Sequence, residues 1–458
     1  MAGDGNSKAV RIKDVELHFL PVKARTPYKF GQYSLESVTC ARVAVTVERN
    51  DGQTATGWGE TPLSVGWAWP GGDAMERLQA MEILCRNFAR ELPAFAEQGH
   101  PMEISMAFQE ANQFDLGEAG IGMPYLPALV CFSAFDLALY DAFGRVHGVP
   151  VFEALGRDWM SRDLSHYLEA DPDAETDFKN TFPDTFLQHP PAQRLPAWHS
   201  VGAGDCLQPE DLTGSEPDDG YPNTLVDWIR RDGIRCLKIK LTGKEYAWDL
   251  QRIIDIGKIA QVENCDWLCA DYNSTVAEVD YVVDMLGVLK ADHPETYARL
   301  LYVEQPFHYE MEDSPADVHP VSSLKPLYMD ESAHDWRLVR EGRRRGWNGV
   351  ALKTCKTLSS ALLMLAWSRA HGLPLMVQDL TNPRLAQVTH ALLAAHAGTV
   401  MGLETNSMQF YPEASSEEAK VHPGLFNRVD GHLDLSTLQG PGFGYGPITR
   451  LHLLDAQE

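Results

Sequence analysis

Hydrophobic and polar residues alternate with a period of two in three stretches near the start of the chain, residues 15–20, 40–47 and 56–60. Successive side chains of a strand point to opposite faces of a sheet, so this pattern predicts three β-strands. Aromatic residues and glycines gather between the first two strands, at residues 26–33, and after the third, at residues 62–70, and both stretches predict loops. These loops either form walls of a ligand pocket or are ordinary turns with partly buried rings.

Apolar residues recur at helical spacing across residues 75–92 and, most strongly, across residues 127–142. The first third of the chain is therefore predicted to be an α+β unit. Asp136 and Asp141 lie in the second helix, where we expect them to cap or pack rather than to bind a ligand. Residues 157–194 show no sustained period and predict an irregular insertion or connection.

Short apolar runs, each followed by a polar stretch and then a helical pattern, recur from Leu195 onward. Alternating strands and helices are typical of parallel βα units, and eight of them fit a (β/α)8-type barrel. The C-terminal residues 422–454 lie outside this rhythm and are expected to return to the N-terminal sheet. The eight predicted strands cover residues 195–201, 236–241, 267–271, 301–304, 327–330, 349–353, 375–379 and 399–404.

Composition narrows the class of protein. The chain has 458 residues, 44% of them hydrophobic and 22% charged, with a net charge of −25. These are ordinary values for a globular protein of more than one domain, and the negative charge argues against binding to nucleic acid or to an anionic membrane. The eight cysteines form no CxxC pair, which makes a zinc site or a redox dithiol improbable. With a polar N-terminus and no run judged long and apolar enough to span a bilayer, we expect a cytoplasmic protein.

The second predicted barrel strand, residues 237–241, carries two lysines at positions i and i+2, Lys238 and Lys240. Both ammonium groups must point to the same side of the strand. Two like charges on a buried face are costly and should lower the pKa of each other. An exposed edge strand whose lysines prevent aggregation is the competing interpretation.

Most of the predicted barrel strands end on a charged residue, and in a βα barrel these ends converge on one face. The third, fourth and fifth strands end on carboxylates, Asp271, Glu304 and Asp330, which can meet around one hard cation such as Mg²⁺. Lysines close the second and sixth strands, at Lys240 and Lys353, nearly opposite each other. A lysine beside a second ammonium group and a divalent cation can act as a base, which suits abstraction of a proton α to a carboxylate.

These residues lie in five motifs whose order and spacing resemble the enolase superfamily, and most of all its muconate-lactonizing-enzyme-like subgroup. A helix similar to that family's connection from capping domain to barrel is found at residues 136–156. The motifs are Lys238-Ile239-Lys240, Asp271-Tyr272-Asn273, Val303-Glu304-Gln305-Pro306, Asp330-Glu331-Ser332 and Leu352-Lys353-Thr354.

The resemblance implies an α+β capping domain, residues 1–156 together with the C-terminal segment 416–458, over a barrel at residues 195–415, with residues 157–194 as the insertion. It implies that Mg²⁺ is bound by the three carboxylates and that Lys240 and Lys353 act as acid and base on opposite faces of the substrate. Lys238 would tune Lys240 and touch the substrate carboxylate. The remaining candidates are Asn273, Gln305 and Glu331 beside the metal ligands, and Tyr28, Tyr33, Asn273, Asp379 and Glu404 as substrate contacts.

Two departures from the family pattern bear on the reaction. The eighth strand ends in Leu403-Glu404-Thr405-Asn406 and lacks the Asp-x-Asp of dipeptide epimerases, and Gln378 stands where the mandelate-racemase branch has a histidine. Racemisation, epimerisation and cycloisomerisation stay open, with dehydration of an acid sugar as an alternative. Metal-assisted hydrolysis and a non-catalytic carboxylate-binding protein are less consistent with two lysines.

Four further expectations concern partners and single residues. The substrate is a small carboxylate, neither nucleic acid nor membrane is a partner, and the chain forms a homo-oligomer. Taken alone, Asp379 and Glu404 would be solvated loop acids. Lys356 and residues 343–345 are expected to be surface charges, and His199 faces the pocket or is a hydrogen-bonded core residue.

Overall fold

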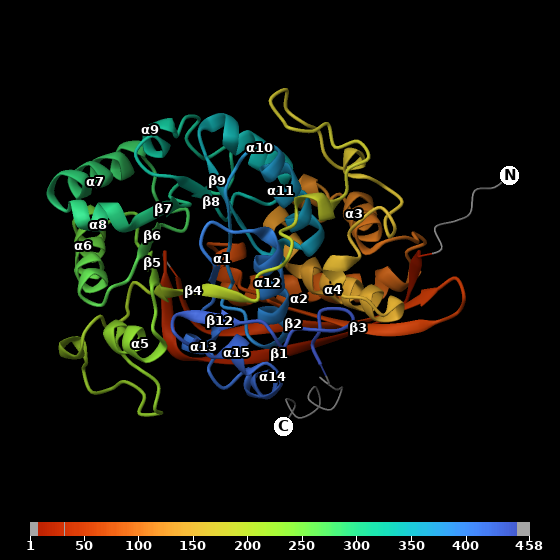
Figure 1. The fold of residues 1–458 in the computed structure, drawn as a ribbon, viewed down its shortest axis with the longest axis horizontal. Helices are drawn as coiled ribbons and strands as arrows, with labels where there is room; N and C mark the ends of the chain where they lie inside the picture. The colour runs from red at the N-terminus through yellow and green to blue at the C-terminus, as the bar shows by residue number, and fades with distance from the viewer. Residues whose placement is uncertain (1–7, 32, 447–458) are drawn as a thin grey trace.

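The computed structural model describes residues 8–31 and 33–446 (Figure 1). Its N-terminal part is a three-stranded antiparallel sheet, β1 (Val10–Phe30), β2 (Tyr33–Arg49) and β3 (Thr54–Pro62), in the order β1-β2-β3. The three predicted strands are confirmed. The loop expected at residues 26–33 is wrong, because Tyr28 pairs with Leu35 and Phe30 with Tyr33, so both strands run on to a hairpin tip.

Four helices accompany this sheet, and the last of them packs directly on it. They are α1 (Val65–Ala68), α2 (Ala74–Glu91), α3 (Pro101–Ala111) and α4 (Tyr125–His147). Gly57 and Gly59 of β3 let α4 approach, since a Cβ at either position would lie 2.0–2.1 Å from α4 backbone atoms. Contrary to the sequence-based expectation, α4 is long and apolar enough to cross a membrane by length and composition, but its apolar window is 100% buried inside the fold.

Among the described residues the second sheet has nine strands. Eight run parallel, each supplied by one predicted run, and the ninth, His432–Asp434, pairs antiparallel with the first of them. The sheet curls, and its order β10-β9-β8-β7-β6-β5-β4-β11 follows the chain apart from the last strand. The parallel strands are β4 (Arg194–Val201), β5 (Cys236–Lys240), β6 (Trp267–Asp271), β7 (Leu300–Glu304), β8 (Leu327–Met329), β9 (Gly349–Leu352), β10 (Leu375–Val377) and β11 (Leu403–Glu404).

Helices follow these strands and cover the outside of the curled sheet (Figure 1). They are α5 (Leu225–Asp232), α6 (Tyr246–Val262), α7 (Val279–Asp292), α8 (Pro294–Arg299), α9 (His319–Ser322), α10 (Trp336–Arg345), α11 (Leu358–Ala370) and α12 (Arg384–Ala397). In the part of the chain that the structure describes, no backbone ladder joins β10 to β11. One hydrogen bond, from Val400 N to Leu375 O at 2.9 Å, links the two segments. The predicted barrel is thus confirmed as a curled parallel sheet, without a closing ladder.

The interior of the curled sheet is a small cluster separate from the main core, with one large or sulfur-bearing side chain from each of six strands: Trp198, Cys236, Cys269, Tyr302, Tyr328 and Met376. Strand alternation places the residue two positions further along each strand on the same inner face, nearer the carboxyl end. The charged residues Lys238, Asp271, Glu304 and Asp330 all stand in this relation to a member of the cluster.

The C-terminal segment contains α13 (Ser407–Phe410), α14 (Ser416–Val421), α15 (Pro423–Phe426) and β12 (His432–Asp434). β12 pairs antiparallel with β4 rather than with the N-terminal sheet. The segment then returns to α4, where Phe443 N donates to Asp141 Oδ1 at 2.8 Å. Residues 447–458 lie outside the described residues.

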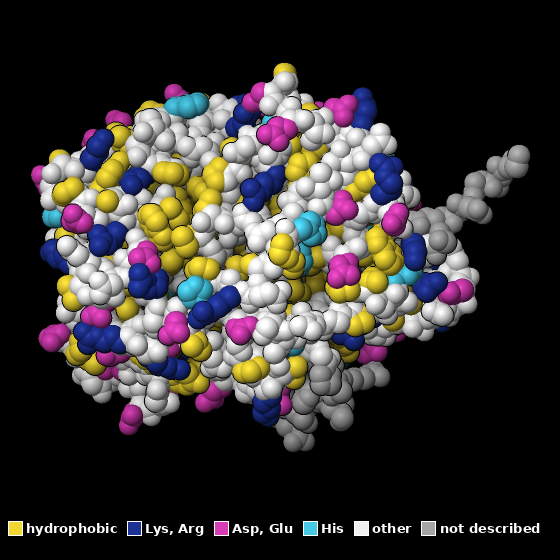
Figure 2. Space-filling view, viewed as in Figure 1, with side chains coloured by type: hydrophobic (Ala, Val, Ile, Leu, Met, Phe, Trp, Pro, Cys, Tyr) yellow, Lys and Arg dark blue, Asp and Glu magenta, His cyan; other side chains and the backbone are white. Residues whose placement is uncertain are grey.

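The irregular insertion at residues 157–194 contains short 3-10 turns and is tied to the barrel by arginines of α10. Arg340 Nε donates to Asp171 Oδ1 at 2.6 Å, and Arg344 Nη2 lies 3.3 Å from the same oxygen. Arg343 pairs with Asp173. The arginines at 343 and 344 are therefore anchors of the insertion rather than simple surface charges. On the face shown in Figure 2, Lys and Arg are interspersed with Asp and Glu and form no single patch.

Candidate functional site

Six carboxyl side chains and four lysines are buried together at the carboxyl ends of the curled sheet. The carboxyl groups are Asp271, Glu304, Asp330, Glu331, Asp379 and Glu404, and the lysines are Lys238, Lys240, Lys353 and Lys356. All ten side chains are at most 5% exposed. Burial of this many charges is costly, so they must pair with one another or with a ligand.

β5 places both of its lysines on the inner face, above Cys236, while Leu237 and Ile239 pack outward into the main core. Lys238 Nζ lies 2.6 Å from Glu304 Oε1, 2.8 Å from Glu404 Oε2 and 3.1 Å from Asp271 Oδ2. Lys240 pairs with the same oxygen of Asp271. The two lysines thus sit on an interior strand, and the edge-strand interpretation is excluded.

The expected lowering of the pKa of the β5 lysines is wrong for this arrangement. Burial, the largest single influence, lowers the pKa of Lys240, but Asp271 and, more weakly, Tyr28 and Glu404 together raise it, so the net shift is upward. The pKa of Lys238 is raised for the same reason, by Asp271, Glu304 and Glu404. Sequence reasoning counted the like charge two residues away and missed the nearer carboxylates.

Lys353 follows β9, four strands from β5 in the sheet order and therefore across the ring. Its Nζ lies 3.2 Å from Asp330 Oδ2 and donates to the main-chain oxygen of Asp379 at 2.9 Å. Burial lowers its pKa, but Asp330, Glu404 and Glu304 together raise it above the ordinary value. Lys240 and Lys353 line one cavity of about 30 Å³ from its two sides.

Aromatic rings from the N-terminal sheet unit cover this cavity. The ring of Phe30 lies 5.9 Å from Lys240 Nζ, and that of Trp67 lies 5.2 Å from Lys353 Nζ. Tyr28 also lines the cavity, and its hydroxyl lies 2.6 Å from Ser200 Oγ. Tyr33 does not line it, because its hydroxyl accepts a hydrogen bond from Gly71 N and braces the hairpin against the segment after α1.

Among the predicted substrate contacts, Lys238, Asp379 and Glu404 line the cavity as well. Asn406 joins the two acids, since its Nδ2 donates to Asp379 Oδ1 at 3.0 Å and to Glu404 Oε1 at 2.7 Å. Burial first, and then the charge of Glu404, raises the pKa of Asp379 to about 6. The interpretation of these two residues as solvated loop acids is wrong, because they are 4% and 3% exposed.

Asn273 lies outside the cavity, beside Glu331. Its Nδ2 donates to Glu331 Oε1 at 2.9 Å, and its backbone N–H donates to Asp271 Oδ1 at 2.9 Å. Gln305 acts similarly on the next segment, because its Oε1 accepts from Asp330 N at 2.7 Å. Both residues therefore hold carboxylate-bearing loops in place.

The three predicted metal ligands come from adjacent strands, and their donor atoms are all oxygens, which suits Mg²⁺. Burial, together with the charges of Asp271, Asp330 and Glu404, raises the pKa of Glu304 to about 8. The ammonium group of Lys238, 2.6 Å away, thus does not offset the burial of this carboxylate and the neighbouring negative charges. The donor chemistry fits a divalent cation, which would compete with the ammonium group of Lys238 for the oxygens of Asp271 and Glu304.

Among the described residues, one Asp/Glu/His/Cys group has its ligand atoms within 4.8 Å of one another, and it lies elsewhere: Asp171, Asp173 and His371. Its acids pair with the arginines of α10, and His371 Nε2 accepts from Asp171 N at 3.1 Å. These contacts already account for the group as an anchor of the insertion.

Gln378 was missed from sequence, and Lys356 was misjudged. Gln378, directly after β10, donates to Glu304 Oε2 at 2.5 Å. Trp67, in the stretch 62–70 predicted as a possible pocket wall, covers two lysines. Lys356, expected on the surface, is fully buried beside Asp330. His199 is a core residue, since its Nδ1 contacts Arg428 Nη1 at 3.1 Å.

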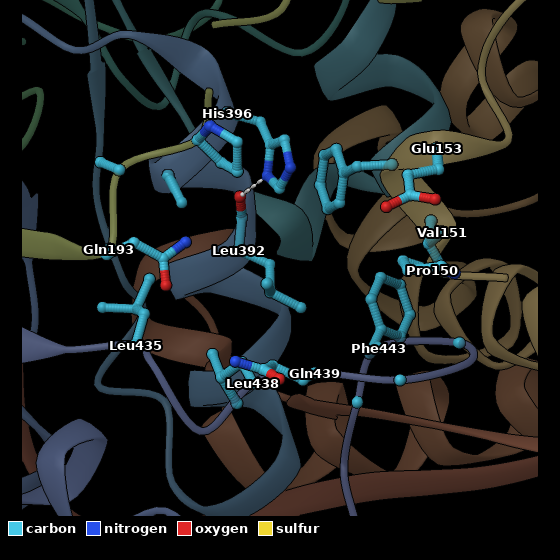
Figure 3. A pocket seen from close by; sticks show the side chains of 17 residues that line it. Pro150, Val151, Glu153, Gln193, Leu392, His396, Leu435, Leu438, Gln439 and Phe443 are labelled. Atoms are coloured by element: carbon cyan, nitrogen blue, oxygen red, sulfur yellow. Dashed lines mark hydrogen bonds between the residues drawn. The ribbon is translucent and has the colours of Figure 1, made fainter. Parts of the chain in front are cut away.

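A larger cavity of about 300 Å³ lies away from these charges, between α12, the segment before β4 and the C-terminal segment (Figure 3). His396 bonds to Leu392 O there and stacks on Phe152 at 4.0 Å. Glu153 is its one lining acid among the described residues, and no lysine or arginine joins it. The candidate active site is therefore assigned by its charges rather than by cavity size.

The barrel part of the chain is similar to a known protein family. Residues 222–448 match the family model "Enolase C-terminal domain-like". An aromatic dipeptide epimerase of Herpetosiphon aurantiacus is 29% identical over 238 residues, which is 51% of this chain and 62% of that protein. The match thus spans less than two thirds of the relative's own length.

Solved structures share the fold across nearly the whole chain. An N-succinyl Arg/Lys racemase from Bacillus cereus superposes with a TM-score of 0.66 at 16% identity and covers 97% of this chain and 98% of its own. A muconate lactonizing enzyme from Pseudomonas fluorescens has a TM-score of 0.64 at 17% identity, with coverages of 97% and 98%.

Proposed function

Because residues 222–448 match the enolase C-terminal domain-like family model, we propose that this protein is a Mg²⁺-dependent enzyme that removes the proton α to a substrate carboxylate, with epimerisation or racemisation as the outcome. One observation carries the proposal: two buried lysines, Lys240 and Lys353, reach the same cavity from opposite sides of the curled sheet. A 1,1-proton transfer needs one group on each face of the substrate, whereas cycloisomerisation or elimination of water needs only one.

Asp271, Glu304 and Asp330 would hold the cation. When bound, Mg²⁺ supplies positive charge to the substrate carboxylate and to the enolate that forms as the proton leaves. The raised pKa of each lysine arises from a candidate ligand, Asp271 for Lys240 and Asp330 for Lys353. Ligation of these carboxylates would weaken their pull on the ammonium groups and lower both pKa values toward the range of a usable base.

One lysine, in its neutral form, takes the α-proton from one face, and the other, as ammonium, returns a proton to the opposite face. The pair exchanges roles for the opposite enantiomer. Lys238 stays beside Glu304 and Glu404 and keeps its charge, so its part is electrostatic.

We propose a substrate with an ammonium group near the reacting carbon, such as a dipeptide or another amino-acid derivative. Asp379 and Glu404 face the cavity, and within the described residues no lysine, arginine or histidine lies within 4.0 Å of the Asp379 carboxylate. Burial and the charge of Glu404 raise the pKa of Asp379, so a cationic group of the substrate would stabilise both acids. The curated relative acts on aromatic dipeptides by its name, which supports the same substrate class although the Asp-x-Asp pattern is absent here.

Residues 1–156 and 416–458 would form the capping domain. The cavity of about 30 Å³ is far smaller than usual ligand sites of about 300–1,000 Å³, so entry of a substrate requires Phe30 or Trp67 to move aside. The hairpin tip at Tyr28 to Tyr33 and the segment around Trp67 are thus the expected closing elements.

Incubation with Mg²⁺ and a panel of dipeptides, N-acyl amino acids and acid sugars in D₂O tests the proposal by loss of the α-proton NMR signal. We expect the wild-type protein to exchange the α-proton of both epimers. Lys240→Ala and Lys353→Ala should each fail to exchange one of the two epimers. Lys258→Ala, a change on the outer surface of α6, is the control. Intact exchange in both active-site variants would falsify the assignment, and exchange without inversion would favour elimination or cycloisomerisation.

A further inference from the structure

Lys356 is a fourth buried lysine, three residues after Lys353. The chain makes one 3-10 turn after β9, Thr354–Lys356, and this turn brings the side chain back to the carboxyl ends of the strands. Its Nζ donates to the main-chain oxygen of Asp330 and lies 3.4 Å from Asp330 Oδ1. Lys353 approaches the other carboxylate oxygen, Oδ2, at 3.2 Å.

We propose that Lys356 is a positioning residue that fixes Asp330 for cation binding, an inference that rests on the proposed function. Asp330 is the only acid among the described residues within 4.0 Å of Lys356 Nζ. A fully buried ammonium group is expensive, and an apolar side chain of the same length would fill this space at lower cost. The two contacts of Lys356 Nζ hold Asp330 at its main-chain oxygen and at its carboxylate.

The turn that carries Lys356 is itself held by the N-terminal unit. Asp136 of α4 accepts hydrogen bonds from Leu358 N at 2.7 Å and from Ser359 Oγ at 2.6 Å. The ring of Trp67 lies 5.6 Å from Lys356 Nζ and also covers Lys353. The position of Asp330 is thus set from the N-terminal unit through Lys356, with no direct contact to the substrate required.

Electrostatics and positioning predict opposite effects when the ammonium group is removed. If Lys356 only repelled a cation, Lys356→Met would tighten Mg²⁺ binding. If it positions Asp330, the same change weakens binding, and losses of about 10–100-fold are usual for residues that orient metal ligands. Lys356→Gln removes the charge but keeps a shorter hydrogen-bond donor, so we expect an intermediate affinity.

Calorimetric titration of each purified protein with MgCl₂ alone makes this comparison without turnover. The expected order of affinity is wild type, Lys356→Gln, Lys356→Met, with at least tenfold between the first and the last. Lys258→Met is the control for loss of a distant lysine. Equal or tighter binding by Lys356→Met overturns the proposal, and a Gln variant no better than the Met variant overturns the donor role. If Lys356→Met does not fold, as judged by thermal unfolding, weaker binding by Lys356→Gln than by the wild type supports the proposal and equal or tighter binding overturns it.

Crystal structures of the wild type and the folded variant separate this proposal from the proposed function. We expect the Asp330 carboxylate to rotate away from its wild-type position, and an unmoved Asp330 overturns the positioning role. Absence of Mg²⁺ binding by the wild type refutes the proposed function, while the position of Asp330 still decides the role of Lys356.

Discussion

Asp136 offers the sharpest test of how the N-terminal unit supports the active site. It is fully buried in α4, yet it caps a helix of the parallel sheet domain, accepting from Leu358 N at 2.7 Å, Ser359 N at 3.2 Å and Ser359 Oγ at 2.6 Å. Asp136→Ala removes all three acceptor contacts at once. The first turn of α11, which follows Lys353 and Lys356 directly, then loses its attachment.

The magnitude follows from the groups left without partners. Each of the two backbone N–H groups costs about 1–3 kcal/mol when buried and unsatisfied, whereas the Ser359 hydroxyl can rotate. Burial raises the pKa of Asp136, so its removal also relieves part of the cost of a desolvated charge. We therefore expect a net loss of about 2–4 kcal/mol in the free energy of unfolding.

Native-state hydrogen exchange of a peptide covering residues 354–362 measures this loss where it arises. A local loss of 2 kcal/mol speeds exchange at Leu358 and Ser359 roughly 30-fold. Asp141→Ala is the matched control, since Asp141 is equally buried in α4 but accepts from Trp58 N and Phe443 N. It should destabilise the protein without loosening α11. Unchanged exchange at Leu358 and Ser359 in Asp136→Ala would refute this account of the coupling.

Three further predictions use other parts of the structure. Burial lowers the pKa of His100 to about 4, so between pH 6.5 and 4 the unfolded chain holds a proton that the native protein lacks, and the free energy of unfolding decreases as the pH is lowered. His100→Asn keeps a helix cap, and a plot of its free energy of unfolding in urea against pH should be shallower over that range by about 1.4 kcal/mol per pH unit. Trp67→Leu removes the ring over Lys353 and Lys356. Each cation–π contact contributes about 1 kcal/mol, so the rate of α-proton exchange should fall roughly fivefold or more. An unchanged rate contradicts the role of the ring. Seven of the eight cysteines are buried, so Ellman's reagent should modify Cys206 alone in the native protein and all eight thiols in denaturant; fast modification of several thiols in the native state contradicts the packing.

The sequence predicted the strands well, because their patterns are local. Each apolar run from residue 195 onward became one strand of the parallel sheet, and the three alternating stretches became β1, β2 and β3. The loop predicted at residues 26–33 was wrong because its aromatic residues suggested a turn. Tyr28 and Phe30 in fact continue the alternation, with Lys29 exposed between them.

The site was predictable where strand ends carry charge, and its finer electrostatics were not. Lys238, Lys240, Lys353, Asp379 and Glu404 meet at the cavity, as the barrel geometry requires. The lysine pKa shifts have the opposite sign to the prediction because Asp271 and Glu404 come from other strands.

Contacts across the fold explain the residues that were missed. Lys356 is one turn past a strand, and only the tertiary fold shows that it turns inward. Gln378 reaches Glu304 from three strands away.

The pairing of β11 with β4 has a consequence for the order of folding. Most strands of the parallel sheet pair with their neighbours in sequence, but β11, the last of them, pairs with β4, the first. Glu404 of β11 also forms an ion pair with Lys238 of β5. Closing so long a loop is entropically unfavourable and slow, so this contact is expected to form late. Until β11 docks, Lys238 lacks one of its carboxylates, and Asn406 cannot bridge Asp379 to Glu404. A chain released before this strand emerges could build most of the sheet and still have no competent active site.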